Sequence, residues 1–146
     1  MSCLPIKSCV LAAMLALVGI GAAGAETQIP QLKGVWKGRF TGGFLVGDIS
    51  HSQDLAEPKS VAGSDKQWIV TIDKQDGSGL AGTRTAEGSE KTEVLLGVIR
   101  RDGKTILLSD EDTLFEATLV SPTTMEVCAQ ETGDAIIATC ELLEKQ

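Results

Sequence analysis

The chain has 146 residues and a formal net charge of −7, with 20 acidic and 13 basic residues. This length allows one domain of ordinary size. The acidic balance, with no basic stripe along the chain, argues against a nucleic acid as partner, because the phosphate backbone would be repelled.

Residues 1–25 have the three parts of a cleavable signal peptide. Lys7 gives a positive start, residues 10–20 are apolar, and Ala23-Gly24-Ala25 has the small side chains of a cleavage site. The apolar stretch has 11 residues, whereas a helix that spans a bilayer needs about 20. A retained membrane anchor is the competing interpretation. We predict cleavage before Glu26 and no membrane span after it.

The first strand is expected from Gly34 to Thr41, where apolar and polar residues alternate. Trp36, Gly38 and Phe40 share one face, and the charged residues between them share the other. This is the pattern of a half-buried strand rather than of a helix. Residues 44–49 either extend this strand past two glycines or form a short strand of their own.

A polar segment from Ser50 to Asp65 then interrupts the alternation. It contains Pro58 and His51, the single histidine, and it is longer than the usual loop of about 4–6 residues. Long loops often carry function. We predict that this segment is either a contact for a protein partner or an ordinary surface loop.

Seven further strands are expected, and most of the turns between them are short. Asp76–Gly79 and Gly88 supply turns, and Asp102-Gly103 supplies the positive φ values that a tight hairpin requires. The seven expected strands are residues 66–74, 80–85, 92–100, 105–109, 113–120, 124–130 and 136–143.

These elements predict one all-β domain over residues 26–146, preceded by the signal peptide. No helical stretch separates the strands, which argues against parallel crossovers. About eight strands with short connections favour an antiparallel up-and-down β-barrel, because closure removes exposed sheet edges. A two-sheet β-sandwich is the alternative. A barrel of this size holds side chains and at most one small ligand.

Two cysteines, Cys128 and Cys140, remain after the signal peptide and flank a turn at residues 131–134. An even pair in an exported chain indicates a disulfide, and the spacing suits a link between two neighbouring strands. A metal site is the competing interpretation, but further ligands are lacking nearby. We therefore predict a disulfide and an oxidising compartment.

Two local patterns resemble the avidin-like proteins and the wider calycin group of small antiparallel barrels. Gly34-Val35-Trp36 is similar to the G-x-W of their first strand, where the tryptophan closes one barrel end. Residues 76–83, Asp-Gly-Ser-Gly-Leu-Ala-Gly-Thr, are similar to the avidin-type hairpin and its return strand. The resemblance implies an up-and-down barrel.

The resemblance does not extend to biotin binding. The biotin site of that family has an asparagine where Gly38 stands and a tyrosine where Arg84 stands, and this chain has no tyrosine. The lipocalin branch packs a late arginine on its first-strand tryptophan, but no arginine follows Arg101 here.

The candidates for a ligand site are three aromatic residues and one arginine: Trp36, Phe40, Trp68 and Arg84. The aromatic residues offer flat apolar walls for a ligand, or else they belong to the core. Arg84 follows Leu80 and Gly82 at a spacing of two, so it faces inward if they do. A charge inside a barrel is costly unless it is paired or hydrated. Arg84 therefore either binds an anionic ligand or pairs with an acid such as Glu93.

No pattern indicates catalysis or metal binding. His51 has no G-x-S-x-G serine to serve as its nucleophile. Asp110-Glu111-Asp112 lacks the spacing of a calcium loop and is expected to be a solvated acidic turn. We predict no catalytic residue, no metal and no cofactor.

The sequence thus predicts a small exported barrel of the periplasm or the medium, and the type of signal peptide points to a bacterium. We expect it to be a non-enzymatic binding protein for a small apolar or anionic ligand. The alternative is an inhibitor of an envelope hydrolase, either a protease or a lysozyme. An acidic surface would complement a basic lysozyme.

Overall fold

The computed structural model of the chain describes residues 28–46, 57–61, 67–132 and 136–146. The predicted signal peptide, His51 and most of the segment from Ser50 to Asp65 lie outside these ranges. Within them, no helix is long and apolar enough to span a membrane. The strands are β1 (Gly34–Val46), β2 (Lys59–Ser60), β3 (Gln67–Asp76), β4 (Gly79–Ala86), β5 (Thr92–Ile99), β6 (Thr105–Ser109), β7 (Leu114–Ser121), β8 (Thr124–Glu131) and β9 (Ile136–Lys145).

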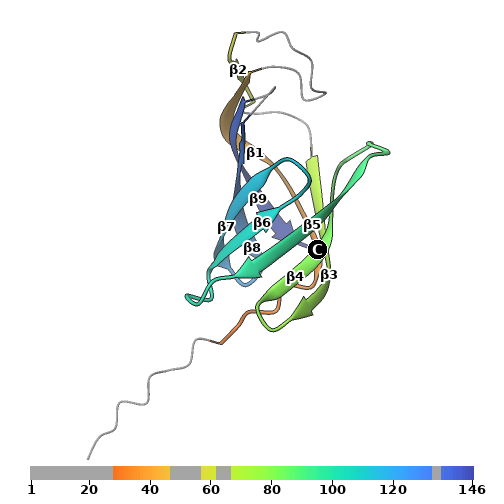
Figure 1. The fold of residues 1–146 in the computed structure, drawn as a ribbon, viewed down its shortest axis with the longest axis vertical. Helices are drawn as coiled ribbons and strands as arrows, with labels where there is room; N and C mark the ends of the chain where they lie inside the picture. Colours follow the sequence, from red (N-terminus) through yellow and green to blue (C-terminus); the bar gives the residue numbers. More distant parts are fainter. Residues whose placement is uncertain (1–27, 47–56, 62–66, 133–135) are drawn as a thin grey trace, which may run out of the picture.

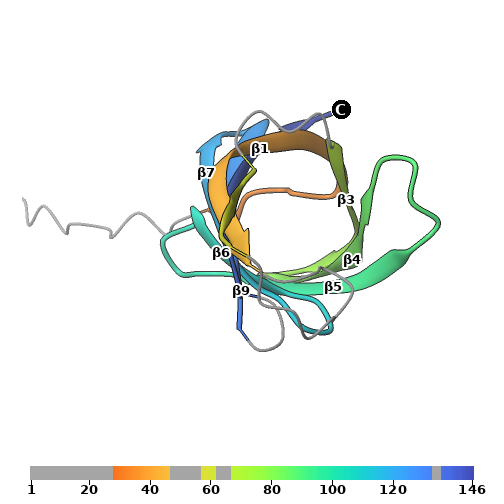
Figure 2. The same cartoon turned by 90° about the horizontal axis from the view of Figure 1, so that it is seen from above.

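Eight of these strands form a closed antiparallel barrel (Figures 1 and 2). β1 pairs with β3, each strand from β3 to β9 pairs with the next, and β9 returns to pair with β1. The predicted all-β up-and-down barrel is therefore confirmed, and the sandwich alternative is not. β2 lies outside this ring and pairs with the last part of β1 at Phe44 and Leu45.

β1 is longer than its first predicted segment, because it continues through Gly42 and Gly43. Its register on β9 shifts between Phe40 and Gly42, and Gly43 has a φ of 139°. Such a positive φ is readily adopted by glycine alone. The bulge at Thr41 and the glycine pair after it therefore bend one strand rather than make a turn that separates two.

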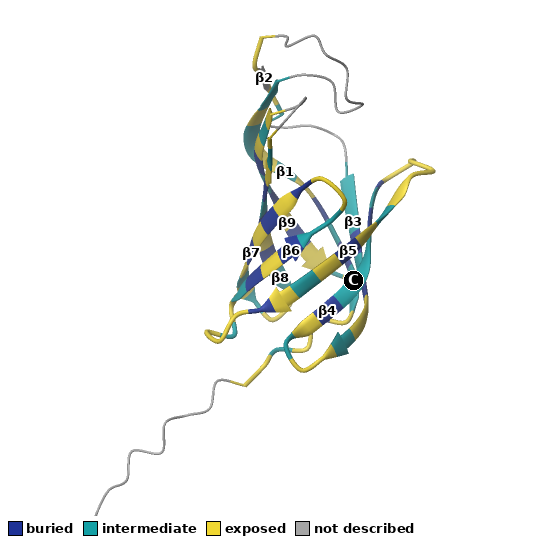
Figure 3. Ribbon diagram, in the orientation of Figure 1, coloured by how far each residue is buried: buried dark blue, intermediate teal, exposed yellow. Residues whose placement is uncertain are grey.

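The barrel core consists of the inward-facing residues of the eight strands, and Figure 3 shows buried and exposed residues alternating along them. Burial of these apolar side chains is the main source of stability, at about 25 cal/mol per Å² removed from water. The largest fully buried side chains are Trp36, Leu32, Ile106, Met125, Leu143 and Val70.

The segment before β1 covers one end of the barrel, which we call the plugged end. Leu32 and Trp36 are 1% and 0% exposed there, and the Trp36 indole N–H donates to the Leu32 carbonyl oxygen at 2.8 Å. The side chain of Gln75 accepts a hydrogen bond from the Leu32 N–H and donates one to the Pro30 carbonyl oxygen, both at 2.8 Å. Side chains of β1 and β3 thus hold the plug through its backbone groups.

Cys128 and Cys140 form the predicted disulfide. They are direct partners in the register of β8 on β9. Their neighbours Val127 and Glu141 are buried, so the disulfide lies on the outer surface of the barrel, as period-two alternation requires. Disulfides of this kind are typical of oxidising compartments.

Candidate ligand-binding site

A cavity of about 200 Å³ lies at the end of the barrel opposite the plug, which we call the pocket end. Its walls come from the last residues of β1, β4 and β8, the first residues of β3, β5 and β9, and the turns beside them. This volume lies below that of typical ligand pockets, which measure about 300–1,000 Å³, and it leaves room for one small molecule.

Three of the four predicted site residues meet at this cavity. Phe40, Trp68 and Arg84 line it, whereas Trp36 lies at the plugged end. Phe40 and Trp68 meet edge to face, with ring centroids 6.1 Å apart and ring planes at 81°. The aromatic wall at the pocket end therefore has two members rather than three.

Arg84 faces inward, as its spacing from Leu80 predicts, and only 8% of the residue is exposed. Its guanidinium carbon lies 3.5 Å from the centroid of the Trp68 ring and 4.9 Å from that of Phe115. A guanidinium over an aromatic face is attracted by the ring quadrupole. The face of Trp68 is therefore occupied by a side chain of the protein itself.

The charge of Arg84 is balanced by carboxylates, which supports pairing rather than a free anion site. Its Nη1 atom lies 3.8 Å from Glu93 Oε2 and 4.0 Å from Asp110 Oδ2. Burial lowers the pKa of Arg84, whereas Glu141, Asp110 and Glu93 raise it. A guanidinium stays protonated in proteins, so one buried cation faces several acids.

Two of these acids are themselves enclosed. The Asp110 side chain is 0% exposed, and burial raises its pKa although backbone N–H groups of Thr113 and Asp112 donate to it. Glu141 is 2% exposed, and burial raises its pKa to about 7 although Arg84 lowers it. Such shifts occur where a carboxylate is poorly solvated.

Three buried polar atoms of this cluster have no hydrogen-bond partner among the described residues: Arg84 Nε, Asp110 Oδ2 and Glu141 Oε2. Buried polar atoms are usually hydrogen-bonded, and each exception calls for a physical reason. Unlike the plug, this end of the barrel therefore keeps polar groups that the fold does not satisfy.

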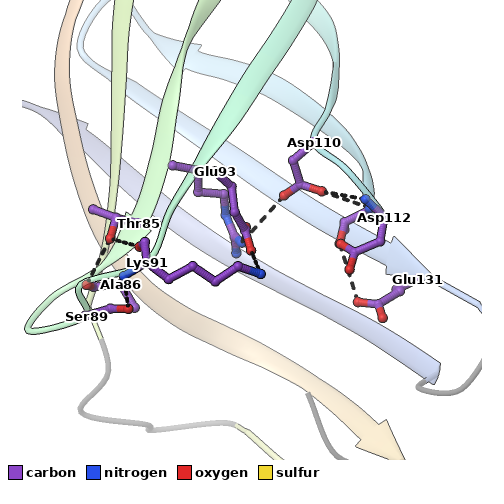
Figure 4. A network of polar contacts seen from close by, with 10 residues as sticks. Thr85, Ala86, Ser89, Lys91, Glu93, Asp110, Asp112 and Glu131 are labelled. Atoms are coloured by element: carbon purple, nitrogen blue, oxygen red, sulfur yellow. Dashed lines mark hydrogen bonds and ion pairs between the residues drawn. The ribbon is translucent and has the colours of Figure 1, made fainter. Parts of the chain in front are cut away.

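The rim of the cavity carries a second ionic pair (Figure 4). Lys91 Nζ lies 2.7 Å from Glu93 Oε1, and the Lys91 side chain is 68% exposed. The hydrogen bond to Glu93 raises the pKa of Lys91. The Thr85 hydroxyl donates to the Lys91 carbonyl oxygen at 2.7 Å, which ties the connection between β4 and β5 to the end of β4.

Sequence reasoning missed Lys91, Asp110 and Glu141. The expectation of a solvated acidic turn at residues 110–112 is wrong for Asp110, because that side chain turns inward toward Arg84. For Glu141 a signal was available, since it alternates with the apolar Leu143 on the last strand. An acid at such a position indicates a buried charge with a distant partner.

A second hollow of about 500 Å³ lies on the outer surface beside the disulfide, next to Gly42 and Gly43. It is more open, and none of the described residues that line it carries a charge. Among the described residues no group of three or more His, Cys, Asp or Glu could hold a metal ion. The cavity at the pocket end is thus the better candidate, because ionic and aromatic groups converge there.

Comparison with protein-family models found no match for the chain. Searches of the curated proteins and of the solved structures found no match either. The resemblance to avidin-like and calycin barrels therefore stays a prediction from two local patterns.

Proposed function

We propose that the protein is a non-enzymatic binding protein that holds one small ligand in the cavity at the pocket end. The observation that carries this proposal is a partly enclosed cavity at one end of a barrel whose other end is covered by Leu32 and Trp36. Small barrels with one closed end commonly use the other for a ligand. Phe40 and Trp68 supply the apolar wall.

We further infer that the protein works outside the reducing cytosol, in the periplasm or the medium of a bacterium. The Cys128–Cys140 disulfide supports an oxidising compartment. The predicted signal peptide over residues 1–25 supports the same compartment.

Native mass spectrometry of the protein purified from its own source tests the proposal. We expect a retained small molecule that is lost when the protein is denatured. In the variant Ala129→Phe an inward residue of the cavity wall, which also borders the outer hollow, is enlarged, and we expect the molecule to be absent. Ala138→Phe is the matched control, because Ala138 is exposed and lines the outer hollow instead.

The outcomes separate the alternatives. Retention by wild type and Ala138→Phe, with loss in Ala129→Phe, supports the proposal. Retention by Ala129→Phe with loss in Ala138→Phe moves the site to the outer hollow and contradicts it. A bare protein that instead co-purifies with an envelope hydrolase, and inhibits that enzyme, contradicts it in favour of the inhibitor prediction.

A further inference from the structure

The charges around the cavity indicate which class of ligand it takes. Among the residues that the structure describes, Arg84 is the only buried cation that lines it, and it is engaged on several sides. One face of its guanidinium covers Trp68, and Nη1 is shared between Glu93 and Asp110. An anionic ligand would have to approach Arg84 in competition with these carboxylates.

Among the described residues that line the cavity, three carry a carboxylate and two carry a positive charge. Arg84 Nε has no hydrogen-bond partner, but less than 1 Å² of this atom is accessible. Glu93 lines the cavity with 19% of its side chain exposed. Asp112 and Glu131 line it as well, and behind the wall lie the enclosed acids Asp110 and Glu141.

The protein already places a cation on one carboxylate of this acidic wall. The Lys91 ammonium contacts Glu93 at 2.7 Å while its side chain stays 68% exposed. Because the ammonium end of this pair is solvent-exposed, Lys91 contributes little to stability and separates easily from Glu93, whose side chain is 19% exposed. The position of the Lys91 ammonium beside Glu93 therefore suits a positive group, and the Lys91 side chain can move away from it.

We propose that the cavity binds a small organic cation, whose charged group takes the place of Lys91 on Glu93 while its apolar part contacts Phe40 and Trp68. This inference rests on the proposed function, because it concerns the same cavity. A flat cation matches both features, since a charge-assisted hydrogen bond to a carboxylate is among the stronger polar contacts and the Phe40 ring lines the cavity beside it.

Three probes of nearly the same shape test the charge preference: benzamidine is a cation, benzamide is neutral and benzoate is an anion. Their binding to the full protein is measured by titration calorimetry and ligand-observed NMR. We expect benzamidine to bind more tightly than benzamide, and benzoate to bind least. The benzamide measurement also reports whether the cavity is intact in each variant.

Two substitutions at the ion pair have opposite expected effects. Glu93→Gln removes the carboxylate, so benzamidine affinity falls by roughly tenfold to a hundredfold, as expected for a hydrogen bond to a charged group. Lys91→Met removes the competing ammonium, so benzamidine affinity rises by roughly twofold to fivefold. Lys104→Met is the matched control, because Lys104 is exposed in the turn between β5 and β6 and no change is expected.

Benzoate binding as tightly as benzamidine would overturn the inference and leave the proposed function standing. Equal binding of benzamidine and benzamide in wild type and in Glu93→Gln would overturn it too. If none of the probes binds but native mass spectrometry finds another retained molecule, the cation inference fails alone. If the purified protein is also empty, the proposed function fails with it.

Discussion

The two ends of the barrel differ in how their openings are filled. At the plugged end, Trp36 and Leu32 fill the opening, and the indole N–H and the Leu32 N–H both have partners. At the pocket end, Arg84 meets more carboxylates than it can satisfy, and several polar atoms there lack partners. Polar groups left unsatisfied by a fold are expected where function has been favoured over stability. The plugged end therefore stabilises the barrel, whereas the pocket end keeps buried polar groups that lower its stability.

The largest expected effect comes from removing the aromatic residue at the plugged end. Trp36→Ala should lower the free energy of unfolding by about 3–5 kcal/mol, because a fully buried indole leaves a cavity. Phe40→Ala at the pocket end should cost less than half as much, since Phe40 is only partly buried. Chemical denaturation measures both values, and equal losses would show that the two ends are equally structural.

Glu141→Gln tests whether the pocket end carries an electrostatic cost. The pKa of Glu141 is raised from 4.5 to about 7 in the fold, so the native state holds a proton that the unfolded chain releases. The stability from this group is therefore complete below about pH 4.5 and lost as the pH rises through about 7. A shift of this size corresponds to roughly 3 kcal/mol.

We expect Glu141→Gln to match wild type near pH 4.5 and to be more stable than wild type at pH 8. Denaturation at both pH values gives the difference. Glu144→Gln is the control, because Glu144 is exposed on the same strand. A wild-type protein that gains stability relative to Glu141→Gln as the pH rises would contradict the burial argument.

The smallest expected effect concerns the attachment of the plug. Gln75→Ala removes the hydrogen bonds to Leu32 and Pro30 and should lower the free energy of unfolding by about 1–2 kcal/mol. Amide hydrogen exchange at Leu32 should become faster, and ligand binding at the other end should not change. Lys74→Ala, at the exposed neighbouring residue, is the control. Unchanged exchange at Leu32 would mean that Gln75 does not hold the plug.

The features of the fold that are set by neighbouring residues were predictable from the sequence. Alternation predicted the strands, and Gly103, with a φ of 68°, makes the hairpin turn expected from Asp102-Gly103. The two-residue period predicted the inward side of Arg84. The continuation of β1 through Gly42 was left open, because two glycines suit a bulge as well as a turn.

The site depended on contacts between distant strands, which local patterns do not specify. Asp110 and Glu141 are enclosed only because the barrel brings the end of β6, β9 and β4 together around Arg84. These three residues are too far apart along the chain for a local pattern to contain them all. The separation of Trp36 from Phe40 and Trp68 also followed from the fold, since β1 runs from one end of the barrel to the other.

The closure of β9 on β1 has a consequence for synthesis. Trp36 lies opposite Lys145 and Phe44 opposite Ala138. During synthesis β1 leaves the ribosome before the other barrel strands, so it can pair with β9 only after all of them have emerged. Strands β3 to β8 can pair one after another as they emerge, but the barrel stays open until β9 is made. A nascent chain stalled before β9 would offer two bare edges to other chains, and aggregation rather than a smaller barrel would follow.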